Sequence, residues 1–159
     1  MSDGLFYVLL PRFNMFSLTN LMEPARIANY LSAEDLYQKT YLSFDGPNIM
    51  SSNGMVVECQ MAPKQMARDD LIFIVGSWGA EHYANRKLFS WLRVQARNGV
   101  RICAVEMGAY ILARAGLLAQ RSATMHWSYL AGFQEQFPDV DVQEQLFTED
   151  GPILCCSGA

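Results

Sequence analysis

The sequence has little positive charge and only two histidines. Its 12 Lys and Arg residues are outnumbered by 16 Asp and Glu, which gives a formal net charge of −4 at pH 7. Affinity for nucleic acids comes largely from basic side chains that neutralise phosphates. The charge balance therefore argues against direct binding of DNA or RNA by this segment.

Long apolar runs and a leader sequence are also missing. No apolar run approaches the roughly 20 residues that a membrane-spanning helix needs. The opening residues, "MSDGLFYVLLPRF", lack the basic segment and long apolar stretch of a secretory signal. We therefore expect a soluble, cytoplasmic protein that makes no contact with a membrane.

The cysteines do not form a recognisable metal-binding pattern. The four residues Cys59, Cys103, Cys155 and Cys156 have no zinc-type spacing, and the last two are sequence neighbours that cannot easily pair with each other. We interpret them as small buried hydrophobic residues in a reducing compartment. No metal and no cofactor is expected.

The pattern that is present alternates short strands with helices over one domain of 159 residues. The apolar stretches "LFYVLL", "LIFIV", "RICAV" and "PILCC" predict buried strands, and "LYQKTYLSFDG" predicts another. Helical periodicity follows from about residue 17, over residues 81–98, from about residue 108 to 115, and in "HWSYLAGFQEQFP". "SATM" predicts a short strand, and Ser-Asn-Gly in "IMSSNGMVVECQ" predicts a hairpin. This alternation indicates an α/β fold with a parallel sheet.

The end of the sequence suggests a longer protein. A buried parallel strand needs helices over both faces of its sheet, yet the sequence stops at Ala159, directly after such a strand. We expect the chain to be a fragment whose next elements lie beyond residue 159.

Four loops follow predicted strands and meet at the edge where parallel sheets bind ligands. They are residues 11–14, 76–79, 106–108 and 156–159. In "VEMGAY", the small Gly108 and Ala109 permit the tight strand-to-helix turn that holds a catalytic nucleophile in many hydrolases, but Glu106 stands at the nucleophile position. Glu106 could act as a general base, or it could pair with a cationic ligand or a neighbouring backbone group.

The segment "CAVEMGAYILARAGLLAQRSATMHW" resembles the elbow-to-His-Trp segment of GlxA-type AraC-family transcriptional regulators. The N-terminal domain of these regulators is PfpI-like and belongs to the class I glutamine amidotransferase-like superfamily. "DGPNIMSSNGM" and "IFIVGSWG" are similar to further motifs of the family. "FYVLLPRFNMFSLTNLMEPARIANYL" is similar to the opening of a subgroup that senses carnitine, glycine betaine and related amines.

This resemblance implies a flavodoxin-like three-layer sandwich with a mostly parallel sheet. It also implies a homodimeric ligand sensor that binds DNA only through a helix-turn-helix domain beyond residue 159. Enzymes of the superfamily place Cys where Glu106 stands, and Cys103 lies too far back on the strand to replace it. The acidic residue that supports the thiol in these enzymes would fall near Asn20, with Glu23 about a turn further along. We therefore expect this domain to be a catalytically inactive scaffold.

Several loop residues are candidates for binding the effector. Glu23 and Glu106 would supply countercharge, and the ring of Trp78 could face a quaternary ammonium group. His126 follows a predicted strand, where a pocket role and a structural role are both open, and core packing is the alternative for Trp127. The complete set of candidate ligand-binding residues is Asn14, Glu23, Trp78, Glu106, Met107, His126 and Trp127.

Two other functions remain open. An enzyme could use Glu106 as a base together with His126. A purely structural dimerisation module would bind no small molecule.

Overall fold

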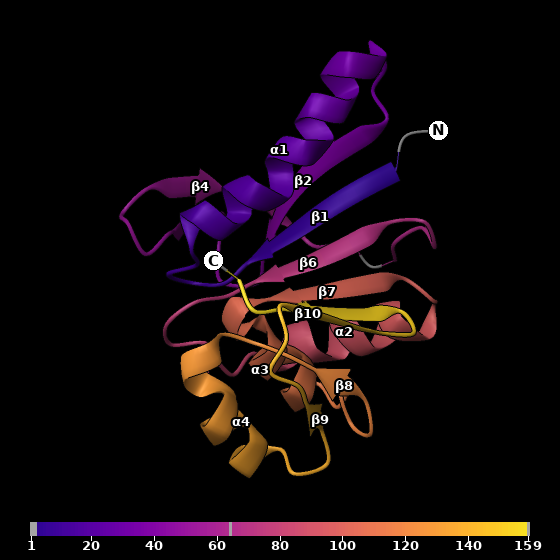
Figure 1. The fold of residues 1–159 in the computed structure, drawn as a ribbon. Coiled ribbons are helices and arrows are strands. Elements are labelled where there is room, and N and C mark those ends of the chain that lie inside the picture. The colour runs from indigo at the N-terminus through magenta and orange to yellow at the C-terminus, as the bar shows by residue number, and fades with distance from the viewer. Residues whose placement is uncertain (1–2, 64, 159) are drawn as a thin grey trace.

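The computed structural model describes residues 3–63 and 65–158, which build a seven-stranded sheet flanked by helices (Figure 1). Neighbouring strands run parallel except at one edge, where β10 is antiparallel to β11. The mostly parallel α/β sheet predicted from the sequence is thereby confirmed. In spatial order, the strands are β10 (Phe147–Asp150), β11 (Ile153–Cys156), β7 (Arg101–Val105), β6 (Leu71–Val75), β1 (Asp3–Leu9), β2 (Tyr37–Ser43) and β5 (Gln60–Met61).

The central strands are apolar on both faces because helices cover both faces. Successive side chains of a strand point to opposite sides of the sheet. Tyr7 and Leu9 therefore pack in one cluster with Leu18 of α1, whereas Val8 and Ile74 pack in the other. The two clusters form the core of a three-layer fold.

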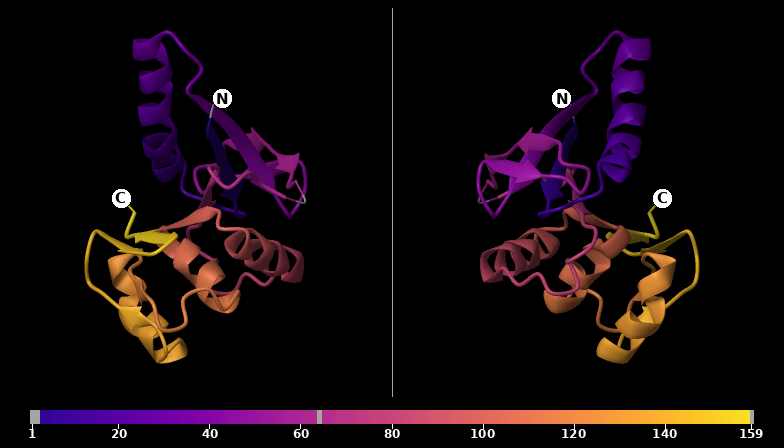
Figure 2. Two further views of the ribbon diagram at one scale, coloured as in Figure 1. Left: turned by 90° about the vertical axis from the view of Figure 1, so that its right-hand side faces the viewer. Right: turned by 90° about the vertical axis from the view of Figure 1, so that its left-hand side faces the viewer.

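In the described part of the chain, four α-helices cover the two faces of the sheet. Figure 1 shows α1 beside β1 and β2, in the half of the molecule opposite to α2, α3 and α4, and the side views of Figure 2 show the same separation. Short 3-10 turns, η1 (Glu106–Gly108) and η2 (Trp127–Tyr129), precede the last two helices. The helices are α1 (Met15–Ser32), α2 (Arg86–Arg97), α3 (Ala109–Arg114) and α4 (Leu130–Gln136).

The predicted helix over residues 81–98 begins later than expected. The side-chain oxygen of Asn85 accepts hydrogen bonds from the backbone N–H groups of Lys87 and Leu88, which caps α2 at its first turn. Residues before Asn85 instead form turns that belong to the loop after β6. The cap formed by Asn85 therefore sets the N-terminal boundary of α2.

The predicted hairpin and the predicted short strand in "SATM" are present, and three short strands were not foreseen. β3 (Asn48–Met50) pairs antiparallel with β4 (Val56–Glu58) across the Ser-Asn-Gly turn. β8 (Ser122–Ala123) is the strand in "SATM", and it pairs with the unforeseen β9 (Asp141–Val142). The unforeseen edge strands β5 and β10 extend the main sheet. These three strands are short and mostly polar, so they carry little sequence periodicity.

The C-terminal end returns to the beginning of the fold. The loop after β11 brings the end of the chain beside the start of α1 (Figure 2), although Ala159 lies outside the described residues. Across residues 3–63 and 65–158, no helix has the length and apolar character to cross a membrane.

Candidate functional site

Glu106 occupies a strained turn at the end of β7. Its φ of 52° lies in the left-handed region, and the residue is only 3% exposed. For a residue other than glycine, such a conformation costs about 1–3 kcal/mol. A β-carbon on Gly108 would overlap the carbonyl oxygen of Ile74, so α3 can approach β6 only because position 108 is glycine. The turn therefore has the geometry of a nucleophile elbow with a carboxyl group in place of a nucleophile.

The start of α1 holds the Glu106 carboxyl group. Oε1 accepts a hydrogen bond from Asn14 Nδ2 at 2.7 Å and another from the hydroxyl of Ser17. Asn14 Oδ1 caps the helix by accepting from Phe16 N at 2.9 Å, which turns the NH₂ group of the same amide toward Glu106. The positive end of the α1 dipole thus faces the carboxyl group.

The second carboxyl oxygen of Glu106 has no hydrogen-bond donor among the described residues. Both hydrogen bonds to the Glu106 side chain end on Oε1, and no residue in the described chain donates to Oε2. Among these same residues, no side-chain oxygen is both fully buried and without a partner. Oε2 must therefore retain accessible surface, and Glu106 lines a cavity where that surface can lie.

The cavity has a volume of about 210 Å³ and lies at the carboxyl edge of the sheet. Loops that follow β1, β6, β7 and β8 contribute to it, in agreement with the general position of ligand sites in open parallel sheets. Five of the seven candidate residues are brought together here. The lining residues are Asn14, Ser77, Trp78, Glu106, Met107, His126 and Tyr129.

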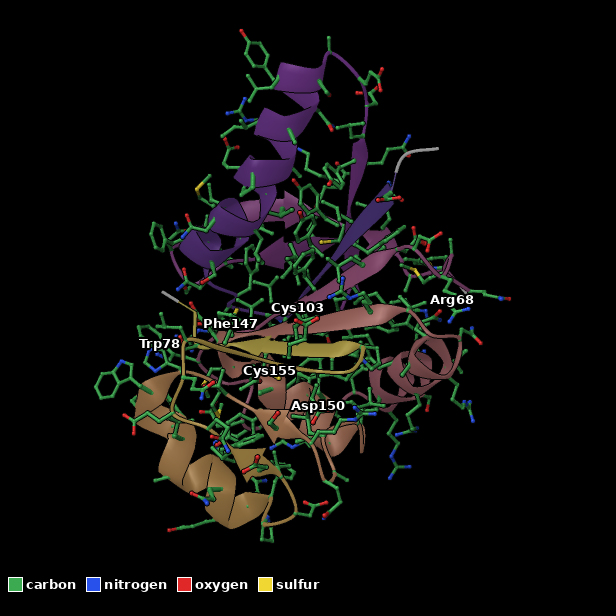
Figure 3. All side chains as sticks on the ribbon, turned by 45° about the vertical axis from the view of Figure 1, so that its right-hand side comes forward. Arg68, Trp78, Cys103, Phe147, Asp150 and Cys155 are labelled. Atoms are coloured by element: carbon green, nitrogen blue, oxygen red, sulfur yellow. The ribbon has the colours of Figure 1, made fainter. Side chains whose placement is uncertain are left out.

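Trp78 forms an exposed aromatic wall of the cavity. The residue is 60% exposed and lies at the periphery of the molecule (Figure 3). Arg114 of α3 fixes the loop that follows it by donating hydrogen bonds to three backbone carbonyl groups, those of Ala80, Glu81 and Tyr83. The indole is thus solvent-accessible while its loop is anchored.

His126 is oriented by its neighbours. Its Nδ1 accepts a hydrogen bond from Ser128 N at 3.4 Å and lies 2.8 Å from Ser128 Oγ. Because Nδ1 accepts a hydrogen bond, the proton of a neutral His126 imidazole is assigned to Nε2. The ring also stacks on Trp127, with centroids 5.7 Å apart. Within the described part of the chain, no hydrogen bond joins His126 to Glu106.

Two candidate residues do not line this cavity. Glu23 pairs with Arg26 at 2.7 Å on α1, about two and a half turns beyond Asn14, so it projects from a different part of the helix. Trp127 is 74% exposed and lines a separate, larger groove beside Leu146 and Phe147. Glu23 was a candidate because it could supply countercharge to a ligand, and Trp127 because it neighbours a predicted pocket loop.

Ser17 of α1 supports the elbow by its contact with Glu106. Asn20, near which the family resemblance would place the acidic residue of the enzymes, is exposed. The available signal was spacing, because Ser17 follows Asn14 by three residues and lies on the same face of the helix. Ser77 and Tyr129 line the cavity as well, although no pattern in the sequence distinguished them.

Over the residues that the structure describes, no three His, Cys, Asp or Glu side chains are grouped so that they could hold a metal ion.

Comparison with known proteins relates the chain to transcriptional regulators. The model of the DJ-1/PfpI family matches residues 7–157. The chain is 38% identical over 158 residues to the HTH-type transcriptional regulator CdhR of Pseudomonas aeruginosa, covering 99% of this chain and 47% of that protein. It is 31% identical over 153 residues to the HTH-type transcriptional regulator GlxA of Rhizobium meliloti, covering 96% and 47%, respectively.

A solved structure has the same fold. An AraC family transcriptional regulator from Pseudomonas putida superposes with a TM-score of 0.83 at 26% identity, covering 98% of this chain and 84% of that one. The chain spans about half the length of the curated relatives it matches.

Proposed function

The chain belongs to the DJ-1/PfpI family, and from this premise we propose that it is the effector-sensing part of an AraC-family transcriptional regulator. The observation that carries the proposal is the Glu106 carboxyl group at the elbow. Its Oε1 is held by Asn14 and Ser17, while no described residue donates to its Oε2, and we infer that the ligand pairs with this second oxygen. An elbow built in this way suits binding better than nucleophilic attack.

The effector is a small organic cation, such as a betaine-like or carnitine-like amine. A carboxyl oxygen and the face of an exposed indole are the groups that recognise a quaternary ammonium, which cannot donate hydrogen bonds. Glu106 and Trp78 bring both groups to one cavity of about 210 Å³, which suits a ligand of amino-acid size. The protonated Nε2 of His126 is available to the anionic end of such a ligand.

Catalysis is the competing function. The elbow strain at Glu106 is typical of active sites, and a general base could act there. However, Nδ1 of His126 is engaged by Ser128, and no hydrogen bond joins the imidazole to Glu106 among the described residues. Turnover that disappears in Glu106→Gln would favour the enzyme over the sensor.

Choline and its neutral isostere 3,3-dimethyl-1-butanol provide the direct test, because they differ mainly in charge. We expect choline, glycine betaine and carnitine to raise the thermal midpoint of unfolding, while the neutral alcohol does not. Glu106→Gln should weaken binding by about 10- to 100-fold, as measured by calorimetry. Trp78→Ala should weaken it by roughly 3- to 30-fold.

Glu23→Gln is the matched control, since it removes a carboxylate that lies outside the cavity and should leave affinity unchanged. Equal binding of choline and the neutral alcohol would refute the cation site. Unchanged affinity in both Glu106→Gln and Trp78→Ala would refute the cavity as the sensor site. If none of the amines stabilises the protein, the structural dimerisation module becomes the better explanation.

The remaining parts of the proposal concern the whole protein. The relatives are about twice as long as this chain and have HTH-type names, which supports a DNA-binding domain beyond residue 159. The sensor would act as a homodimer whose arrangement changes with the effector, to the extent that the effector binds the two arrangements unequally. Sequencing the gene downstream of the Ala159 codon and measuring the molar mass in solution, with and without ligand, test these two points.

A further inference from the structure

Two cysteine thiols lie together on neighbouring strands beside the elbow. Cys103 of β7 pairs with Leu154 of β11, and Cys156 of β11 pairs with Val105 of β7. In a parallel ladder, this register puts Cys103 and Cys156 on the same face, two residues apart along the strands. Cys155 points to the opposite face. Figure 3 shows Cys103 and Cys155 on these two strands.

Three neighbouring groups lower the pKa of Cys156: the Cys103 thiol and the backbone N–H groups of Gly158 and Glu106. The Cys103 hydrogen bond is the largest cause that lowers the pKa of Cys156 to about 7, despite burial and the nearby Glu106 carboxyl group. The same hydrogen bond raises the pKa of Cys103. The two pKa shifts have opposite directions, and they favour deprotonation of Cys156 over that of Cys103.

The two sulfurs differ in access as well as in charge. Cys156 is partly exposed at the last position of β11, whereas Cys103 is only 7% exposed. Burial raises the pKa of Cys59 to about 11 and that of Cys155 to about 12, so these two thiols remain protonated at neutral pH. Cys156 alone among the described cysteines is not buried, and Cys103 is the thiol that lies beside it on the same face of the neighbouring strand.

We propose that Cys156 is a hydroperoxide-reactive thiol and that Cys103 captures its oxidised form as a reversible disulfide. The Cys156 thiolate attacks the distal oxygen of a hydroperoxide, so that an S–O bond forms and the O–O bond breaks. The departing hydroxide or alkoxide takes a proton from solvent, leaving Cys156 as a sulfenic acid, oxidised by two electrons. The Cys103 sulfur then attacks Cys156, an S–S bond forms, the S–O bond breaks, and water leaves with the Cys103 proton.

Closing the disulfide requires a movement at the end of β11. Disulfides need Cα atoms about 4.4–6.8 Å apart, and residues two positions apart along a parallel ladder are normally further apart than this. Cys156 is followed by the loop residues Ser157 and Gly158, so the strand end can shift without opening the central ladder. The shift would move the Cys156 sulfur away from the backbone N–H group of Glu106. Oxidation would therefore also change the surroundings of the elbow.

The test is mass spectrometry of the intact protein after treatment with hydrogen peroxide, followed by thiol alkylation. In the wild type, we expect a loss of two hydrogens, a peptide that links Cys103 to Cys156, and full reversal by dithiothreitol. In Cys103→Ser, the resolving thiol is missing, so Cys156 should gain one oxygen and react with dimedone. In Cys156→Ser, neither product should form.

Cys59→Ser is the matched control. It removes a buried thiol that directly follows β4, away from Cys103 and Cys156 in the sequence, and it should leave both products unchanged. The wild-type result needs no variant, so a folding defect in a mutant cannot obscure it. The proposal is overturned if Cys156 stays reduced at peroxide concentrations that oxidise free cysteine. It is equally overturned if sulfenic acid persists in the wild type without the disulfide. Neither outcome depends on whether the cavity binds an amine.

Discussion

The backbone of Gly158 lies against the side chain of Glu106, so closely that a β-carbon at position 158 would overlap Glu106 Cγ. Gly158 also has a φ of +87°, a conformation that residues with a β-carbon adopt at a cost. The loop after β11 therefore closes over the elbow only because this residue is glycine. The contact links the last described residue of the chain to the centre of the candidate site.

Gly158→Ala should lower the free energy of unfolding by about 1–3 kcal/mol, because it adds both backbone strain and a steric overlap. Urea denaturation measures the change. Gly132→Ala is the control, since nothing lies within 4 Å of its β-carbon position in α4, and alanine there should stabilise the helix by up to about 1 kcal/mol. Equal effects of the two substitutions would contradict the close contact.

Ser17→Ala should destabilise the protein by about 1.5–3 kcal/mol if the Glu106 carboxyl group is charged, because it removes a buried donor from Oε1. A double-mutant cycle with Glu106→Gln, followed by chemical denaturation, isolates the contribution of this pair. Thr19→Ala, which removes an exposed hydroxyl from the same helix, should change stability by less than about 0.5 kcal/mol. A coupling energy near zero would show that the hydrogen bond contributes nothing.

Asn14→Asp separates the two roles of Asn14. Aspartate caps a helix as well as asparagine does, but it cannot donate to Glu106 and brings a second carboxylate beside it. We expect Asn14→Asp to be less stable than Asn14→Ser at pH 7, and we expect the difference to shrink as the pH falls. Acid protonates one carboxyl group of the pair, which removes the repulsion and restores a donor. Thermal unfolding from pH 7 to 4 measures this difference, and a gap that widens in acid would contradict the contact.

Arg114→Lys should loosen the loop that carries Trp78, because an ammonium group cannot reach three carbonyl groups with the geometry of a guanidinium. Hydrogen exchange of the amides in residues 79–84 should become faster, while exchange in β7 stays unchanged. Affinity for the effector should fall along with the increase in exchange. Faster exchange in β7 as well would indicate general unfolding instead of a local effect.

Alkylation of Cys156 by iodoacetamide should accelerate as the pH rises through about 7 and level off above about pH 8, because the thiolate is the reactive form. The donors that lower this pKa are the Cys103 thiol and the two backbone N–H groups, while burial and the Glu106 carboxyl group oppose them. At pH 7, Cys156 should react roughly a hundredfold faster than Cys59, whose pKa is raised to about 11. Peptide mapping at several pH values gives both rates, and a midpoint near 9 would rule out the donor environment.

Much of the fold could be predicted from local pattern. Apolar runs such as β6 and β7 are long enough to indicate buried strands, and Ser-Asn-Gly indicates the hairpin between β3 and β4. The edge strands β5 and β10 could not be predicted in this way, because half-exposed short strands are stabilised by pairing with their neighbours. Their existence depends on the sheet that they join.

The candidate site shows the same division. Three of the four loops predicted from the sequence, residues 11–14, 76–79 and 106–108, line the cavity, and the loop after β8 supplies its other lining residues. Glu23 was a candidate as countercharge and Trp127 as a neighbour of a pocket loop, yet Glu23 pairs with Arg26 on α1 and Trp127 lines a separate groove. Position along the chain predicts which loop a residue belongs to, but it does not predict where the side chain points.

The sequence by itself determined the alternation of strands and helices, the tight turn after β7, and the presence of a carboxyl group at that turn. These features depend on residue type and on spacing between near neighbours. Only the tertiary structure decided that Asn14 and Ser17 hold Glu106, that Gly158 packs against it, and that Cys156 meets Cys103 beside it. The physical reason is that these contacts join segments far apart in the chain, and parallel strands that end at one edge bring them together.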